Sequence, residues 1–180
     1  VSGSTIILNN FNIGKAPKML TPTQKLEGVI FEQDITGFTC EENHFTAVSG
    51  PSGVQTVGTV CVHTGEMNKT IRRNTFTGLK FGNVANQINS HYGPDGIRGL
   101  YYGCNQVFGS LSNDFTVPDG TIKARQGLEL PNGTYGAAGN NFAYTATDFF
   151  NKSPVITYYY KPIGNQEPIT FNNGVFPTEA

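Results

Sequence analysis

A pattern of one small or apolar residue, one asparagine and one phenylalanine recurs five times along the chain. The small or apolar residue stands three places before the asparagine, and the phenylalanine stands two places after it. The asparagines of the five motifs are Asn9, Asn43, Asn74, Asn113 and Asn140. Their spacing ranges from 27 residues (113 to 140) to 39 residues (74 to 113). A motif that persists while its period varies predicts a stacked repeat, in which each unit buries its apolar side against the next.

Glycines provide a second recurring mark. Gly28, Gly58, Gly99 and Gly127 each open a short apolar segment, and the next motif asparagine follows after 15, 16, 14 and 13 residues. This nearly constant separation predicts a rigid rung with connecting loops of variable length. It places the insertions between residues 45 and 58 and between residues 76 and 99.

Stacked parallel strands return equivalent side chains to positions about 4.8 Å apart, so the motif predicts two internal columns. The asparagines are expected to form a hydrogen-bonded ladder at a corner, because asparagine tolerates the left-handed backbone conformation of a sharp turn. The phenylalanines are expected to stack in the core. They are Phe11, Phe45, Phe76, Phe115 and Phe142. We interpret both columns as structural and not as a ligand site.

Composition supports an all-β fold. The chain has 22 glycines and 10 prolines, and no segment has the 3.6-residue apolar period of a helix. Charged residues make up 14% of the chain and the formal net charge is −1, which argues against a nucleic-acid partner. No segment reaches the roughly 18 to 20 apolar residues of a membrane-spanning helix. Because the chain starts at Val1 without a leader segment, we expect it to be a piece of a longer protein.

The cysteines and histidines predict no metal site. Cys40, Cys61 and Cys104 have spacings of 21 and 43 residues, which match no zinc-binding pattern, and His44, His63 and His91 do not cluster with them. Two interpretations of the cysteines remain open. They are small buried thiols, or Cys40 and Cys61 form a disulfide between strands that neighbour each other across one coil. We expect no cofactor.

Three segments resemble the right-handed parallel β-helix of large cell-surface proteins from Bacteroidota. They are residues 37–46, 71–79 and 99–105, and the resemblance covers about residues 5 to 145. It implies a right-handed parallel β-helix of about five irregular rungs over residues 1–150. It also implies a secreted or outer-membrane-attached protein that is exported by the type IX secretion system, whose machinery would then be a partner. The chain has no recognisable C-terminal sorting domain, so this export route is implied by the resemblance alone.

The motif stops after residue 142, and residues 151–180 are predicted to form a strand and a linker that leads out of the solenoid. The strand runs from Pro154 to Pro162 and contains Tyr158, Tyr159 and Tyr160. Strand alternation places two of these rings on one face and one on the other. Such a strand could cover the open end of the solenoid, and its tyrosines are candidates for stacking on a sugar.

For function, the sequence favours a monomeric, non-catalytic module that contacts a carbohydrate or another surface, as in adhesion. The alternatives are a polysaccharide lyase or glycoside hydrolase on a β-helix scaffold, and a phage tail-fibre module. An enzyme of either type needs acidic groups held near one another, and no acidic pair recurs on successive rungs. If the chain is an enzyme, the first catalytic candidates are His91, Asp95 and Arg98, in and beside the longest predicted loop.

Overall fold

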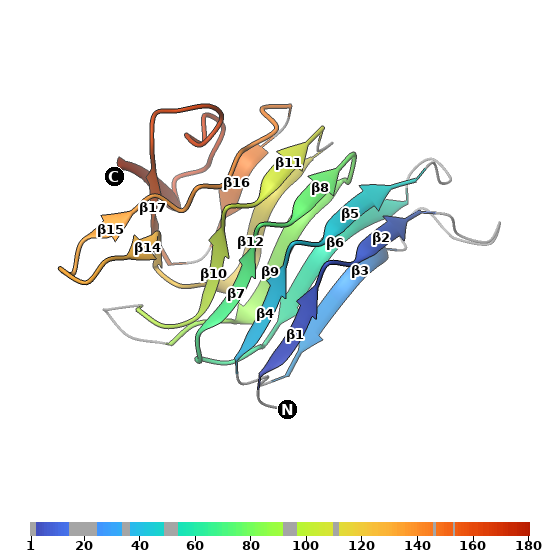
Figure 1. The fold of residues 1–180 in the computed structure, drawn as a ribbon, viewed down its shortest axis with the longest axis horizontal. Coiled ribbons are helices and arrows are strands. Elements are labelled where there is room, and N and C mark those ends of the chain that lie inside the picture. Colours follow the sequence, from blue (N-terminus) through green and yellow to red (C-terminus); the bar gives the residue numbers. More distant parts are fainter. Residues whose placement is uncertain are drawn as a thin grey trace.

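The computed structural model describes residues 3–14, 25–33, 37–48, 54–91, 97–109, 112–145, 147–152 and 154–180. These residues form strands and loops and contain no helix. Most of the strands stack in parallel into a solenoid, which confirms the predicted all-β parallel architecture (Figure 1). Two of its sheets contain four strands each and the third contains five, so the solenoid has about four turns, close to the prediction of about five irregular rungs.

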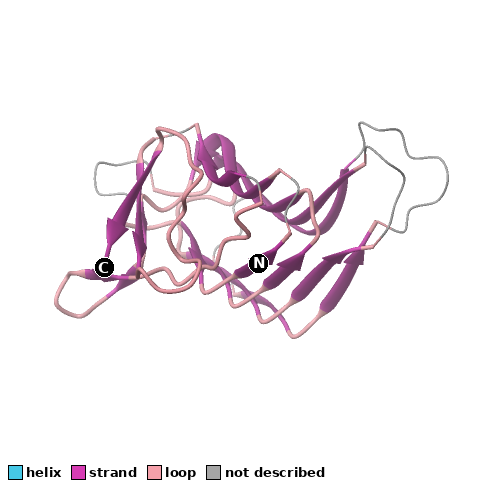
Figure 2. Ribbon diagram, turned by 90° about the horizontal axis from the view of Figure 1, so that it is seen from above, coloured by secondary structure: helices cyan, strands magenta, loops and turns pink. Residues whose placement is uncertain are grey.

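Each coil contributes one strand to each of three parallel sheets. The first sheet contains β1 (Ser4–Ile7), β4 (Phe38–Glu41), β7 (Lys69–Arg72) and β10 (Leu100–Gly103). The second sheet contains β2 (Asn10–Ile13), β5 (His44–Ala47), β8 (Thr75–Thr77) and β11 (Gln106–Phe108). The third sheet contains β3 (Lys25–Glu32), β6 (Gln55–Val62), β9 (Phe81–Ile88), β12 (Asn113–Thr121) and β16 (Thr147–Asn151). Figure 2 shows the strands from above, in layers that enclose the core.

The first and second sheets meet at a sharp corner, where an asparagine ladder runs through the coils. In each step the backbone N–H and the Nδ2–H of one asparagine donate to Oδ1 of the next, as Asn43 does to Asn74 at 2.9 and 3.0 Å. The ladder runs through Asn9, Asn43, Asn74, Asn105 and Asn140. The prediction of Asn113 was wrong, because this residue lies in β12 of the third sheet and Asn105 takes the fourth rung.

The left-handed residue at each corner is the one before the asparagine, not the asparagine itself. Leu8, Glu42, Arg73 and Cys104 have φ angles of 58°, 56°, 55° and 55°, and Gly139 has a φ of 74°. The asparagine side chain is then directed along the solenoid axis toward the next coil. The ladder therefore stabilises a backbone conformation that non-glycine residues adopt only at a cost.

The phenylalanine column is shorter than the motif suggests. The rings of Phe11, Phe45 and Phe76 are stacked, with centroids 4.7 and 5.0 Å apart, and Val107 takes the fourth position in register. Phe115 lies in the third sheet and meets Phe142 edge to face at 5.6 Å. It is a core residue, but it does not belong to this column. The motif around Phe115 has the same residue spacing as the others, but it lies in the third sheet and not at the corner before the second sheet.

Glycines in the third sheet make room for this column. Thr59 pairs with Val29 on one side and with Asn83 on the other, so the preceding residues Gly28, Gly58 and Gly82 stand in register. A Cβ at position 58 would lie 2.5 Å from Cδ1 of Phe76, and one at position 28 would lie 2.7 Å from Cδ1 of Phe45. The phenylalanine rings of the second sheet thus pack directly on the glycine backbone of the third sheet.

Two of the glycines in the predicted second mark lie elsewhere. Gly99 precedes β10 in the first sheet, and Gly127 lies between β13 (Arg125–Gln126) and β14 (Leu128–Glu129). The predicted insertion between residues 76 and 99 was also wrong in part, because it contains β9. In that strand the glycine, Gly82, is followed by the polar Asn83 and does not open a short apolar segment, and the strand buries Gly82, Asn83 and Ala85.

The three cysteines are free thiols. Cys40 and Cys61 are buried and Cys104 is exposed, so the disulfide considered for the first two is not formed. Cys40 contacts the asparagine ladder instead, with Sγ 3.4 Å from Nδ2 of Asn43. Burial raises the pKa of the Cys40 thiol to about 12 and raises that of Cys61 as well.

The C-terminal segment packs against the end of the solenoid. β17 (Ile156–Tyr160) lies between β13 and β18 (Val175–Glu179) in a parallel sheet, and β14 forms an antiparallel pair with β15 (Tyr135–Gly136). Ile156, Tyr158 and Val175 are buried in the same core cluster as the solenoid residues. Within the described ranges, no helix is long and apolar enough to cross a membrane.

Candidate functional site

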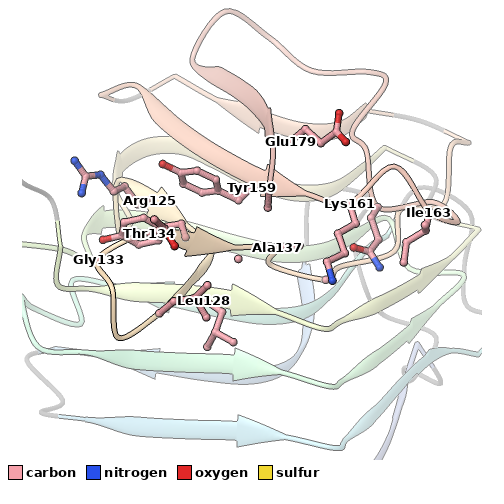
Figure 3. Close-up of a pocket in the computed structure, with 15 residues that line it drawn as sticks. Arg125, Leu128, Gly133, Thr134, Ala137, Tyr159, Lys161, Ile163 and Glu179 are labelled. Carbon is pink, nitrogen blue, oxygen red and sulfur yellow. The ribbon is translucent and has the colours of Figure 1, made fainter.

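A concave site lies beside the C-terminal sheet, and we call it the tyrosine pocket. It has a volume of about 960 Å³ and is open to solvent. Its walls come from the β14–β15 hairpin, from β17 and from the segment that follows β17. In Figure 3, Arg125 and Thr134 lie at one end of the pocket and Lys161 and Ile163 at the other, with Ala137 between them.

Two stacked rings form the aromatic wall of the pocket. The centroids of Tyr135 and Tyr159 are 5.1 Å apart and the planes differ by 16°. Tyr159 comes from β17, whose strand alternation directs this side chain away from the core. Gly127 permits its position, because a Cβ there would lie 2.8 Å from Cδ2 of Tyr159.

A tight turn brings Tyr135 to its partner. The N–H of Gly133 donates to the carbonyl of Leu130 at 2.9 Å, and Gly133 has a φ of 78°. Asn132 Oδ1 accepts from both the N–H and the hydroxyl of Thr134, at 3.1 and 2.7 Å. The turn reverses the chain, so that Tyr135 pairs with Glu129 across the hairpin.

Two cations lie on the aromatic cluster. The guanidinium carbon of Arg125 is 5.2 Å from the centroid of Tyr135, and Nζ of Lys123 is 5.9 Å from the centroids of both Tyr101 and Tyr135. Burial lowers the pKa of the Lys123 ammonium, Glu129 acts against this shift, and Arg125 adds to it. Cation–π contacts of this kind hold the rings and the cations in a fixed relative arrangement.

The rest of the pocket combines apolar surface with a polar rim. Leu128 and Ile163 are each 58% exposed. Lys161, Gln166 and Glu179 add a cation, an amide and a carboxylate. The Oε1 atom of Gln166 is buried and accepts no hydrogen bond within the described part of the chain. The pocket therefore offers apolar faces and polar groups of both donor and acceptor type.

The three predicted tyrosines have three different environments. Tyr158 is fully buried, and its hydroxyl accepts a hydrogen bond from Nδ2 of Asn140 at 3.3 Å. It is a core residue, so its prediction as a binding residue was wrong. Tyr159 lines the pocket. Tyr160 packs partly against the core, and its hydroxyl lies 3.2 Å from Oε1 of Glu167.

The catalytic candidates do not form a clustered site among the described residues. Nδ1 of His91 lies 2.7 Å from Oε2 of Glu66, and both side chains are about half exposed, at 51% and 54%. Arg98 meets His91 through the backbone, where its carbonyl accepts the His91 N–H at 3.2 Å. Asp95 lies outside the described residues. The described ranges contain no group of three or more His, Cys, Asp or Glu residues that could hold a metal ion.

A second charged cluster lies at the corner between the first and second sheets. The carboxylate of Glu41 is almost buried and meets Arg72 and Arg73, each at 3.0 Å. Here two guanidinium groups satisfy one carboxylate at a strand end. This geometry is that of a structural ion-pair network and leaves no acid poised for proton transfer.

Lys123, Arg125 and Tyr135 were not predicted as site residues from the sequence. A signal for the hairpin was present in Pro131-Asn132-Gly133, because Asn-Gly between short apolar segments is typical of a hairpin turn. That hairpin would have placed Tyr135 opposite residue 129. Its stacking on Tyr159 could not be predicted, since the two residues are joined only by the packing of two separate sheets.

Comparison with protein-family models, with curated proteins and with solved structures gives no match for this chain.

Proposed function

We propose that this chain is a non-catalytic module that binds carbohydrate through the tyrosine pocket. The observation that carries the proposal is the stacked pair of Tyr135 and Tyr159 in an open concave site with a polar rim. Aromatic side chains with one apolar face and one polar end suit ligands that are themselves both apolar and polar. Sugars are such ligands, since their ring C–H groups are apolar and their hydroxyl groups need hydrogen-bond partners.

The polar rim supplies partners for the hydroxyl groups of a sugar. Lys161 and Glu179 line the pocket on the side away from Arg125, so donors and acceptors stand on both sides of the apolar surface. The buried Oε1 of Gln166 would gain a hydrogen bond from a ligand donor that enters the pocket. An open site with few fixed polar groups favours binding over chemistry, because catalysis requires groups held at a reacting bond.

The biological setting belongs to the same proposal. The likeness of the repeat segments to the β-helices of Bacteroidota surface proteins supports a secreted or surface-attached bacterial protein, with adhesion as its role and type IX secretion as its export route. A stiff parallel solenoid presents its binding site at a fixed distance from the rest of a surface protein. This setting predicts that the chain is exposed on intact cells, which protease shaving followed by mass spectrometry would detect.

A glycan array followed by calorimetry tests the binding proposal. We expect the 180-residue chain to bind a defined set of glycans, and Tyr159→Ala to weaken that binding ~10-fold or more, which corresponds to about 1.4 kcal/mol. Tyr160→Ala is the matched control. It removes the same side chain from the next position, which does not line the pocket, and is expected to change the affinity less than ~2-fold.

Three results would contradict the proposal. The first is the absence of any bound glycan, and the second is an equal loss of affinity for the Tyr159 and Tyr160 variants. The third is turnover of acidic polysaccharides, detected as new reducing ends or unsaturated products. If His91→Ala abolished that turnover, the candidates around residues 88–98 would form the active site, and the chain would be an enzyme.

A further inference from the structure

Two cations project from one face of the strand that borders the tyrosine pocket. Arg125 opens β13, and Lys123 stands two residues before it. Residues two apart along an extended chain lie on the same face. Gln126 points the other way, into the core, where its Oε1 accepts the N–H of Tyr102 and its Nε2 donates to the Leu100 carbonyl, each at 3.0 Å. The buried Gln126 therefore fixes the register that directs Lys123 and Arg125 outward together.

The two cations meet at one aromatic ring. Nζ of Lys123 and the guanidinium carbon of Arg125 lie 5.9 and 5.2 Å from the centroid of Tyr135. The ring of Tyr159 stacks on the same Tyr135 ring. The two positive charges thus lie beside the aromatic wall of the pocket.

Positive charge is in excess at this end of the pocket. Burial lowers the pKa of the Lys123 ammonium most, and the charge of Arg125 lowers it further. Glu129 opposes this shift, but among the described residues no carboxylate forms an ion pair with Lys123. An anionic group bound here would be attracted to both cations and would offset the repulsion between them.

The other end of the pocket has a different charge distribution. Lys161 and Glu179 line it together, so one cation stands with one carboxylate. Figure 3 shows Arg125 and Thr134 at one end and Lys161 at the other. A ligand that fits this distribution has its negative group near Arg125 and uncharged surface along the rest of the pocket.

Arginine and lysine make complementary contacts with such a group. A guanidinium offers a planar pair of N–H donors that matches two oxygens of a carboxylate or a sulfate ester, and an ammonium offers a compact charge. Because Lys123 and Arg125 both contact Tyr135, the charged group of a ligand would be bound next to the ring system against which its sugar packs.

We infer that the tyrosine pocket binds an acidic sugar whose anionic group lies between Lys123 and Arg125. This inference rests on the proposed function of the pocket and specifies its ligand class. The sugar ring packs against the wall formed by Tyr135 and Tyr159. The anionic group is the carboxylate of a uronic acid or a sulfate ester, and both present anionic oxygen atoms to the two cations.

Glycan pairs that share a backbone and differ in the anionic group test the inference by calorimetry. One pair is a galacturonan oligomer and its methyl ester, and the other is a sulfated galactan oligomer and its desulfated form. We expect the 180-residue chain to bind the anionic member of one pair at least ~10-fold more tightly than the neutral member. The pair that shows this preference distinguishes a carboxylate from a sulfate ester.

Lys123→Met tests the ammonium itself, because it keeps an unbranched side chain against Tyr101 and Tyr135 but removes the charge. We expect it to weaken binding of the anionic glycan ~5-fold or more and to change binding of the neutral one less than ~2-fold. Lys152→Met is the matched control. Nζ of Lys152 lies 5.6 Å from the centroid of Phe150, outside the pocket, and its removal changes the net charge equally. This control is expected to change either affinity less than ~2-fold.

Two further variants extend the test. The carboxylate of Glu129 competes with the ligand for the charge of Lys123, so Glu129→Gln is expected to strengthen binding of the anionic glycan ~2-fold or more. Arg125→Gln is expected to weaken this binding as Lys123→Met does. It takes the place of Lys123→Met if circular dichroism shows that the latter does not fold.

Three outcomes would overturn the inference. Equal affinity for the charged and neutral members of both pairs, with binding still lost in Tyr159→Ala, would remove the acidic ligand and leave carbohydrate binding in place. Equal losses in Lys123→Met and Lys152→Met would indicate an effect of net charge and not of a site. The absence of binding to every glycan would overturn both this inference and the proposed function.

Discussion

The hydroxyl of Tyr158 lies 3.3 Å from Nδ2 of Asn140 and ends the asparagine ladder. Four coils pass the same pair of hydrogen bonds from asparagine to asparagine, and the last donor needs an acceptor from a different residue type. Tyr158 brings this acceptor from β17 into the core, where burial raises the pKa of its hydroxyl and keeps it neutral. One buried hydroxyl group thus joins the C-terminal sheet to the repeat.

Tyr158→Phe is expected to destabilise the protein. It leaves Nδ2–H of Asn140 with one acceptor fewer in a fully buried site, at a cost of about 1–3 kcal/mol. Urea unfolding followed by circular dichroism measures the loss. Tyr160→Phe is the control, because its hydroxyl meets Glu167 at the surface and its removal should change stability by less than about 0.5 kcal/mol. An equal loss of stability in the two variants would contradict the role of the Tyr158 hydroxyl as the terminal acceptor of the ladder.

Removal of one rung should cost more than removal of the terminal acceptor. Oδ1 of Asn74 accepts two hydrogen bonds from Asn43, and Nδ2 of Asn74 donates to the Cys40 carbonyl and to Asn105. Asn74→Ala leaves several buried groups unsatisfied, and we expect a loss of at least about 2 kcal/mol in the free energy of unfolding.

Asn113→Ala provides the comparison for the Asn74 variant. Asn113 has the same sequence motif but lies in β12, is partly exposed and stands outside the ladder. Its replacement should cost under about 1 kcal/mol. If the Asn113 variant were the less stable of the two in thermal unfolding, the assignment of the fourth rung to Asn105 would be wrong.

Gly58→Ala tests the packing of the phenylalanine column on the third sheet. The added Cβ would lie 2.5 Å from Cδ1 of Phe76 and 2.6 Å from the carbonyl oxygen of Gly82, so we expect a loss of about 1–3 kcal/mol. A smaller side chain at position 76 should relieve part of this clash. Gly58→Ala is therefore expected to cost less stability in the Phe76→Leu background than in the natural chain. Gly136→Ala is the control, since its Cβ would meet nothing closer than 3.7 Å. A double-mutant cycle in urea that returned no coupling would contradict direct contact.

Alkaline pH should lower the stability of the fold through its buried thiols. Burial raises the pKa of Cys40 from 9.0 to about 12 and also raises that of Cys61. Between these values the unfolded chain has lost the thiol proton that the folded chain retains. The stabilising contribution is therefore complete below pH 9.0 and falls as the pH rises toward the folded-state pKa. Urea midpoints at pH 8 and about pH 10.5 measure this slope.

Variants of Cys40 and Cys104 show which thiol causes the change of stability with pH. Cys40→Ala should reduce the difference between the two midpoints, because it removes one of the buried thiols. Cys104→Ala should leave the difference unchanged, since Cys104 is exposed. A slope that responds to Cys104 and not to Cys40 would place the titrating thiol at the surface.

The sequence predicted the fold class correctly because equivalent positions in successive coils carry recurring residue types. Asn43 and Asn74 stand at equivalent corners, and Phe45 and Phe76 follow each of them at the same distance on the same inner face. The prediction failed where a motif matched by spacing alone. Asn113 and Phe115 carry the pattern but lie in the third sheet, and the unremarkable Asn105 makes the fourth rung.

The candidate site was much less predictable than the fold. Tyr159 was among the three candidate tyrosines, and strand alternation suggested that it faces away from its neighbours. No sequence property says which of the two faces of β17 is covered. Tyr135 and Arg125 reach Tyr159 from a hairpin and from another strand, and long-range packing alone brings these three residues together.

The spacing of residue types is sufficient to predict that this chain stacks β-strands into coils, because equivalent positions in successive coils need similar side chains. Long-range packing sets which sheet each motif enters, where the ladder ends and which tyrosine reaches the surface. These features depend on contacts such as that of Tyr158 with Asn140, whose partners lie 18 residues apart and on different strands or corners. Such contacts arise from the burial of one element against another and leave no periodic signal in the sequence.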